Sequence, residues 1–316
     1  MVTRIGLGLA AVGRPAYINL NRRRDLAGSR SVAALRGRAE ELLDDAYRLG
    51  IRYFDAARSY GRAEEFLAGW LRAREPLPEP VVCGSKWGYT YVGRWRMDAP
   101  VHEVKDHSLA QLRRQFAESR SLLGDHLNLY QIHSATRESG VLEDKSVLAE
   151  LVALTRAGLA VGLSVSGPRQ AEVVERALDA TVDGVNPFTA VQATWNLLEP
   201  AAGPALRAAH SAGWAVLVKE AMANGRLVSG GDGGPPGPVG HLADLRGVGP
   251  DAVALAAVLA QEWVDVALSG AVTTGQLESN LRALEVQLSD GEREGLTAIA
   301  EPSALYWATR AALAWS

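Results

Sequence analysis

The feature that most constrains this chain is a regular alternation of short apolar runs with amphipathic helical stretches. The apolar runs begin near residues 4, 51, 80, 127, 159, 190, 214 and 264. They recur about every 37 residues, a length that accommodates one strand, one helix and two loops. Strict strand-helix alternation predicts a parallel sheet with helices outside it. Eight units favour a closed α/β barrel of the (β/α)8 TIM type, a single domain over residues 1–316.

Two stretches interrupt this alternation. Residues 13–35 contain the basic run Asn21-Arg-Arg-Arg24, and residues 229–250 are crowded with glycine and proline. We expect both to be long loops within the barrel. The second is too rich in glycine to pack a core and is predicted to be either a mobile flap or a tolerated insertion. Gly6-Leu-Gly8 lacks the third glycine of a dinucleotide-binding fingerprint, which argues against a Rossmann domain.

Composition excludes several classes of protein. The 33 Lys and Arg residues against 36 Asp and Glu leave a net charge of −3, which offers no broad field for nucleic acid or an anionic membrane. The longest apolar run, Ala252 to Ala260, is far shorter than the ~20 residues needed to span a bilayer. Lone Cys83 cannot form an internal disulfide. The apolar segment near the start is followed at once by Arg14-Pro15, without the small-residue cleavage site of a signal peptide. We therefore expect a cytoplasmic protein.

Polar side chains gather where three consecutive strands end. Asp55 ends the second strand and Tyr60 follows it, Lys86 ends the third, and His133 ends the fourth. Each alone is typical of a solvated or hydrogen-bonded loop residue. Because the carboxyl ends of the strands carry the chemistry of such barrels, the four together predict an active site at one rim. The remaining histidines have no ligand spacing, and no metal is expected.

These motifs resemble those of the aldo-keto reductases. The matching segments, in order, are Asp55-Ala-Ala-Arg-Ser-Tyr60-Gly61 with Glu65, Ser85-Lys86-Trp87-Gly88, Tyr130-Gln-Ile-His133-Ser134, Val161-Gly-Leu-Ser164, Val191-Gln192-Ala-Thr-Trp-Asn196-Leu-Leu, Lys219-Glu-Ala-Met-Ala-Asn-Gly225-Arg-Leu, and Ser269-Gly270-Ala to Leu277-Glu-Ser-Asn280. They extend over nearly the whole chain. Single motifs are short, but the ordered set is specific.

The resemblance implies reduction of an aldehyde or ketone to an alcohol by NAD(P)H, or the reverse oxidation, on a small-molecule substrate. It makes Tyr60 the general acid and base, with Lys86 easing the tyrosine pKa toward neutrality and Asp55 holding that lysine. His133 would orient and polarise the carbonyl. From their place after the third and first strands, Trp87, Trp95 and the loop Gly13 to Asn21 are expected to border the carbonyl. The C-terminal segment 304–315 is predicted to be a helix packed on the barrel, with a cover for the pocket as the alternative.

The resemblance also implies the residues that contact the cofactor, which are Gly8, Ser164, Gln192, Lys219, Gly225, Gly270, Gln276 and Asn280. Three of these regions depart from the common pattern. Val165 replaces an asparagine, Lys219 replaces a tyrosine that stacks on the nicotinamide, and Gly270 and Gln276 replace cations that hold a 2′-phosphate. The family frequency favours NADP(H), and NAD(H) is possible. Arg282 is the nearest remaining candidate cation, and we expect modest discrimination between the nucleotides.

Two other functions fit some of these residues. A Schiff-base aldolase would use Lys86 or Lys219 as the nucleophile, but it gives Asp55, Tyr60 and His133 no common role. A non-catalytic regulatory relative would bind nucleotide without turnover. The compatible substrates span sugar, steroid, aliphatic and polyketide carbonyls, and the sequence leaves the oligomeric state open.

Overall fold

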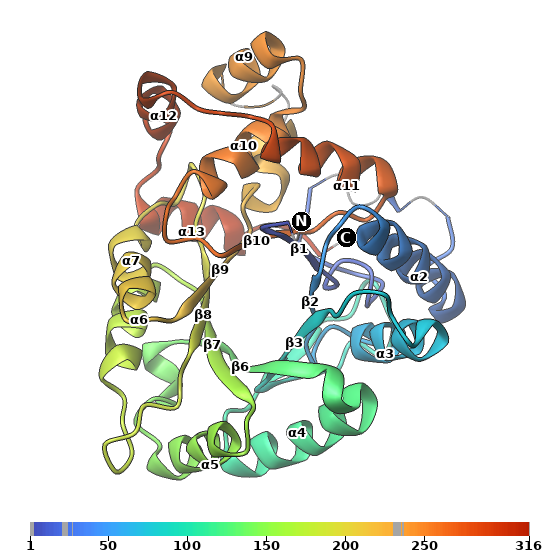
Figure 1. The fold of residues 1–316 in the computed structure, drawn as a ribbon, viewed down its shortest axis with the longest axis vertical. Helices are drawn as coiled ribbons and strands as arrows, with labels where there is room; N and C mark the ends of the chain where they lie inside the picture. The colour runs from blue at the N-terminus through green and yellow to red at the C-terminus, as the bar shows by residue number, and fades with distance from the viewer. Residues whose placement is uncertain (1–2, 21–24, 27, 230–234, 236, 316) are drawn as a thin grey trace.

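The chain forms a closed barrel of eight parallel strands, seen end-on in Figure 1. The computed structural model describes residues 3–20, 25–26, 28–229, 235 and 237–315. The barrel strands follow one another around the barrel in chain order, the last pairing with the first. They are β1 (Ile5–Gly8), β2 (Tyr53–Asp55), β3 (Val82–Trp87), β6 (Leu127–Ala135), β7 (Ala160–Val165), β8 (Ala190–Thr194), β9 (Ala215–Lys219) and β10 (Val266–Ser269). All eight predicted strands and the barrel are confirmed.

Helices surround the strands and bury one face each against them (Figure 1). The helices that alternate with the barrel strands in the repeating pattern are α2 (Val32–Arg48), α3 (Ala63–Arg74), α4 (Leu109–Leu123), α5 (Lys145–Arg156), α6 (Gln170–Asp179), α7 (Gly203–Ser211), α10 (Pro250–Leu259) and α11 (Thr274–Leu281). Local signals set their ends. In α4, the Ser108 hydroxyl accepts from the Gln111 amide at 3.2 Å, and the helix stops at Gly124, where φ is +54°.

The structure corrects the prediction for residues 229–250. A short helix, α8 (Arg226–Ser229), precedes this stretch, and α9 (Gly237–Arg246) occupies its second half. Val239, Leu242 and Ala243 of α9 are buried in a cluster with residues of α10 and of the C-terminal helix. This half of the stretch therefore packs a core. Three apolar positions spaced along ten residues suffice to bury one helix face, despite the glycine and proline around them.

Other elements were not predicted. A two-stranded antiparallel hairpin, β4 (Tyr89–Tyr91) with β5 (Glu103–Lys105), follows β3. Helix α12 (Asp290–Thr297) and the predicted C-terminal helix α13 (Ser303–Ala311) complete the chain, and Tyr306 and Trp307 bury α13 against the barrel helices. Short 3-10 turns lie at Gly124–His126, Arg137–Ser139, Ala223–Gly225 and Arg282–Leu284. Within the described ranges, the helices are all too short or too polar to traverse a bilayer.

Candidate active site

The predicted catalytic residues come together at the carboxyl ends of β2, β3 and β6. Asp55 is the last residue of β2, Lys86 lies near the end of β3, and His133 lies late in β6. Tyr60 follows β2 in the turn before α3. The backbone at Gly13 lies very close to this turn. A Cβ atom on Gly13 would lie only 2.3 Å from the Tyr60 carbonyl oxygen.

Lys86 and Asp55 form an ion pair that is almost fully buried. The Lys86 ammonium donates to the Asp55 carboxylate and, at 3.0 Å, to the Ala56 carbonyl. The other Asp55 oxygen accepts from the Gln192 amide at 2.9 Å. The Lys86 Nζ lies 4.9 Å from the centre of the Tyr60 ring. A buried charge is tolerated only with such partners, so this pair fixes both side chains in place.

Tyr60 is buried, and its pKa differs from the sequence-based expectation. Burial raises the pKa of Tyr60 well above its usual value, and the Asp55 carboxylate raises it further, while the Arg14 guanidinium opposes them. The Arg14 Cζ lies 5.4 Å from the Tyr60 ring centre. In this structure, therefore, the pKa of Tyr60 is not eased toward neutrality, chiefly because the ring is buried and secondly because of the Asp55 charge. The phenol remains protonated across the ordinary pH range.

His133 lies across from Tyr60, with the two ring centres 5.4 Å apart and edge to face. Its Nδ1 lies 3.3 Å from the Ser59 hydroxyl. Burial lowers the pKa of His133 well below 6.5, and the positive charge of Lys86 lowers it further. The ring is consequently neutral near pH 7 and carries a single N–H, which suits hydrogen bonding to a polar group without proton exchange.

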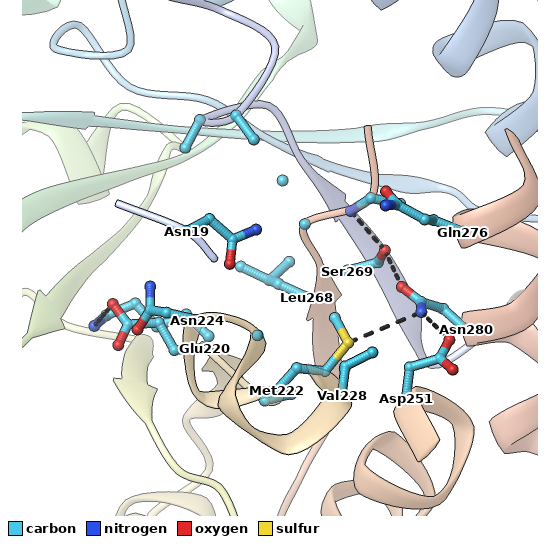
Figure 2. Close-up of a pocket in the computed structure, with 18 of the residues that line it drawn as sticks. Asn19, Glu220, Met222, Asn224, Val228, Asp251, Leu268, Ser269, Gln276 and Asn280 are labelled. Atoms are coloured by element: carbon cyan, nitrogen blue, oxygen red, sulfur yellow. Dashed lines mark hydrogen bonds and ion pairs between the residues drawn. The ribbon is translucent and has the colours of Figure 1, made fainter. Parts of the chain in front are cut away.

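A cavity of about 530 Å³ opens beside Tyr60. This volume is in the range of small-molecule and cofactor sites. Every predicted cofactor position except Ser164 lines it: Gly8, Gln192, Lys219, Gly225, Gly270, Gln276 and Asn280. Ser164 is buried, and its hydroxyl accepts from the Ser134 backbone amide at 2.8 Å. Figure 2 shows residues from the loop after β9 facing residues of β10, α10 and α11 across this cavity.

The two predicted substrate-bordering indoles are not in the lining of this cavity. Trp87 is wholly buried and packs edge to face on His107, 5.6 Å away. The Trp95 indole donates to the Arg30 carbonyl at 2.8 Å. Their contact with a substrate stays a prediction. From the loop after β1, Tyr17 and Asn19 line the cavity.

Lys219, at the end of β9, is held by two hydroxyls. Its Nζ donates to Thr194 at 2.7 Å and to Ser166 at 3.2 Å. Burial lowers the pKa of Lys219 to about 8, against the raising effect of Glu220. Glu220 in turn accepts a bidentate ion pair from Arg310 of α13. The C-terminal helix is thereby tied to the cavity wall.

The side of the cavity formed by β10, α10 and α11 contains a network of amides and carboxylates (Figure 2). Ser269 donates to Asn280, and the Asn280 amide donates to Asp251, each at 2.6 Å. The Gln276 carbonyl accepts from the Val272 amide, and its NH2 group donates to Asp25, each at 2.9 Å. Figure 2 shows the Ser269–Asn280–Asp251 chain along one wall.

Several of these residues were not predicted from the sequence. Asp25 and Asp251 gave no local signal, because both come from segments distant in sequence from their partners. The sequence motif contains Glu65, which is half-exposed, whereas neighbouring Glu64 is buried and accepts from Ser85 and Ser119 at 2.6 Å each. A helical register anchored on Phe66 and Leu67 would have pointed to Glu64 as the buried position.

Arg282, the predicted phosphate cation, lies outside the cavity lining. It donates to the Gly247 carbonyl at 2.8 Å and lies 3.7 Å from Glu285. Its side chain is about half exposed. Within the part of the chain that the structure describes, no group of three or more His, Cys, Asp or Glu side chains is arranged to hold a metal ion.

Comparison with known proteins gives concordant matches. A model of the Aldo/keto reductase family matches residues 27–301. The uncharacterized oxidoreductase YqkF of Bacillus subtilis is 29% identical over 127 residues, a match that covers only 39% of this chain and 39% of that relative. A putative aldo-keto reductase from Pseudomonas aeruginosa is 26% identical with a TM-score of 0.62, covering 93% of this chain and 90% of that one. The aldo-keto reductase AKR11C1 from Bacillus halodurans shares the fold, with a TM-score of 0.67 at 20% identity over 95% of this chain and 93% of that one.

Proposed function

The chain belongs to the aldo/keto reductase family, and on that premise we propose that it reduces aldehydes or ketones to alcohols, or runs the reverse oxidation. The substrate is a small carbonyl compound or alcohol. One observation carries the proposal: Tyr60, Lys86 and His133 converge at the carboxyl ends of three strands, with Tyr60 on the wall of the cavity. The buried, lone Cys83 is consistent with a cytoplasmic location.

The cavity has the chemistry that a nicotinamide nucleotide needs. Its walls offer amide and hydroxyl groups, from Gln192 at one end and from Ser269, Gln276 and Asn280 at the other. Such groups suit the carboxamide, the riboses and the base. Gly270 leaves the backbone open there, because a Cβ atom added to it would meet no other atom within 4 Å. Family frequency favours NADP(H) as the nucleotide.

When bound, a nicotinamide nucleotide would supply a hydride to the carbonyl carbon. Tyr60 donates its phenolic proton to the carbonyl oxygen, since its raised pKa keeps that proton in place until the oxygen becomes basic. The buried Lys86 ammonium stabilises the phenolate left behind, and Asp55 positions the ammonium. The neutral His133 ring donates its N–H to the carbonyl oxygen and orients it.

The two alternatives from the sequence make different predictions. Membership of an oxidoreductase family does not support a Schiff-base aldolase. Trapping of a substrate on Lys86 or Lys219 by borohydride would support that alternative. A non-catalytic relative would bind nucleotide tightly and turn over no carbonyl.

The test is the change in absorbance at 340 nm with a panel of aldehydes and ketones and each reduced nucleotide. Tyr60→Phe is expected to lower kcat by about 10²–10⁴-fold, because proton donation is lost. Its Kd for nucleotide, measured by fluorescence, should stay near the native value. Near-normal turnover by this variant would remove Tyr60 from the mechanism.

A further inference from the structure

We propose that the Lys219 ammonium makes this cavity bind the reduced form of a nicotinamide nucleotide more tightly than the oxidised form, whose ring is positively charged. This inference rests on the proposed function and names the residue that distinguishes the two redox states. It applies to NAD(H) and NADP(H) alike, because the oxidised and reduced forms of each differ only in the nicotinamide ring.

Lys219 lies at the part of the cavity where the nicotinamide must bind. The residues that line the cavity include Asp55, Tyr60, Gln192 and Lys219. A hydride reaches a carbonyl held by Tyr60 only from a ring beside that tyrosine. On β8, the Gln192 amide donates to Asp55 at 2.9 Å, and the Thr194 hydroxyl, two residues on, accepts from the Lys219 Nζ at 2.7 Å. Side chains two residues apart on a strand share a face, so the ammonium lies one step from Gln192 toward the carboxyl ends of the strands.

The positive charge of Lys219 is only partly balanced. Among the residues that the structure describes, its hydrogen bonds go to two hydroxyls, Thr194 at 2.7 Å and Ser166 at 3.2 Å. A Glu220 carboxylate oxygen lies 3.8 Å from the Lys219 Nζ. Both oxygens of that carboxylate already accept from the Arg310 guanidinium, at 2.8 and 2.5 Å. One carboxylate therefore serves two cations.

The other groups whose charges act on Lys219 are Lys86 and Asp55. These two form the buried ion pair of the active site, so Asp55 is matched by a cation of its own. The charge of Lys219 also reaches His133. Burial lowers the pKa of His133 well below 6.5, and Lys219 is among the neighbouring cations that lower it further. The ammonium therefore acts on the space in which the ring and the carbonyl would meet.

A positive charge at this position distinguishes the two redox forms. The nicotinamide ring carries one positive charge when oxidised and none when reduced. Charge near the ring of a bound cofactor is one means by which a protein tunes it. Like charges in a partly enclosed cavity repel each other more strongly than they do in water. Lys219 therefore weakens binding of the oxidised form and leaves binding of the reduced form largely unaffected.

The test is the Kd of both redox forms on the full chain, NADH against NAD+ and NADPH against NADP+, measured by titration calorimetry. Near pH 7 the native protein should bind the reduced form at least about tenfold more tightly, a difference of ~1.4 kcal/mol. Lys219→Met should lower that ratio about tenfold, mainly by strengthening binding of the oxidised form. Lys145→Met is the matched control, because Lys145 is exposed and lies outside the cavity lining, and it should leave the ratio unchanged.

The pH dependence separates the charge of Lys219 from its shape. Burial lowers the pKa of Lys219 to about 8, so the ammonium is charged near pH 7 and loses its proton as the pH rises further. The repulsion is present below this pKa and lost above it, so the native ratio should fall between about pH 7 and about pH 9.5. Neighbouring Glu220 has a pKa of about 2 and keeps its charge throughout. Lys219→Arg should hold a high ratio across the range, because a guanidinium stays protonated there. Lys219→Met should hold a low one.

The native titration needs no variant, so the test stays decisive if Lys219→Met does not fold. A native ratio that stays constant across this pH range would overturn the inference and leave the proposed function standing. Equal or tighter native binding of the oxidised form near pH 7, or a ratio that Lys219→Met leaves unchanged, would do the same. Binding of no nucleotide in either redox form would instead overturn the proposed function.

Discussion

At the residue scale, the Lys86–Asp55 pair links stability to chemistry. Both side chains are almost completely buried, and each provides the other's opposite charge. Removing one member leaves an uncompensated charge in the barrel, whereas removing both leaves polar or apolar groups that cost less to bury. Stability and catalysis should thus respond differently to single and double substitutions.

We expect Lys86→Met to lower the free energy of unfolding by roughly 3–5 kcal/mol and to depress kcat for carbonyl reduction about as much as Tyr60→Phe does. The pH optimum should move as well, since the phenolate would lose its neighbouring charge. Adding Asp55→Asn should recover part of the stability and none of the rate. Denaturant titration and steady-state kinetics on all three variants measure this. Recovery of the rate in the double variant would show that Lys86 acts only through Asp55.

The site residues that were predicted and those that were not differ in how the sequence specifies their positions. Asp55, Lys86 and His133 lie at or near the ends of predicted strands and Tyr60 follows one. Their positions in the chain therefore sufficed to predict that they meet at one rim. Asp25 and Asp251 reach the cavity through contacts with α11, whose partners no local pattern specifies. The departure at Gln276 was visible in the sequence, but the carboxylate beside it was not.

At the element scale, the turn that holds Tyr60 depends on close packing between the loop after β1 and the start of α3. The Gly13 carbonyl accepts from the Arg62 amide at 2.8 Å. A Cβ atom on Gly13 would lie 2.6 Å from the Ala63 Cβ atom as well as 2.3 Å from the Tyr60 carbonyl oxygen. Gly61, at φ +63°, completes the turn.

Gly13→Ala should therefore separate these two segments. We expect a loss of roughly 1–3 kcal/mol in stability, the usual cost of overpacking, and a lower kcat because Tyr60 moves with the turn. Gly37→Ala is the matched control: Gly37 lies within α2 with open space around its Cα, so alanine should stabilise the helix by up to about 1 kcal/mol. Equal effects of the two substitutions on kcat would argue against this role for the turn.

Element prediction succeeded where periodicity was strong and failed where it was brief. The eight strands and most barrel helices repeat one pattern, and glycines such as Gly124 mark their ends. The β4–β5 hairpin has three residues in each strand, too few to establish an alternation. Helix α9 follows a glycine- and proline-rich stretch and shows its apolar face only when packed beside α10.

At the scale of the whole molecule, the Glu220–Arg310 ion pair joins the last helix to the barrel. Burial raises the pKa of Glu220, but the positive charges of Lys219 and Arg310 outweigh it and lower the pKa to about 2. The unfolded chain binds a proton at this carboxyl near pH 4.3. The stabilisation is therefore complete above pH ~4.3 and is lost as the pH falls toward ~2.

Glu220→Gln should accordingly be less stable than the native protein near neutral pH, by roughly 3 kcal/mol, and this difference should shrink steadily as the pH falls from about 5 toward 2. Denaturant midpoints at a series of acid pH values measure it. Glu285→Gln is the control, because that carboxylate is exposed and its ion pair with Arg282 should contribute little at any pH. A difference between native protein and Glu220→Gln that stays constant across this range would mean that the ion pair does not tie α13 to the barrel through charge, and that apolar burial of Tyr306 and Trp307 alone holds the helix in place.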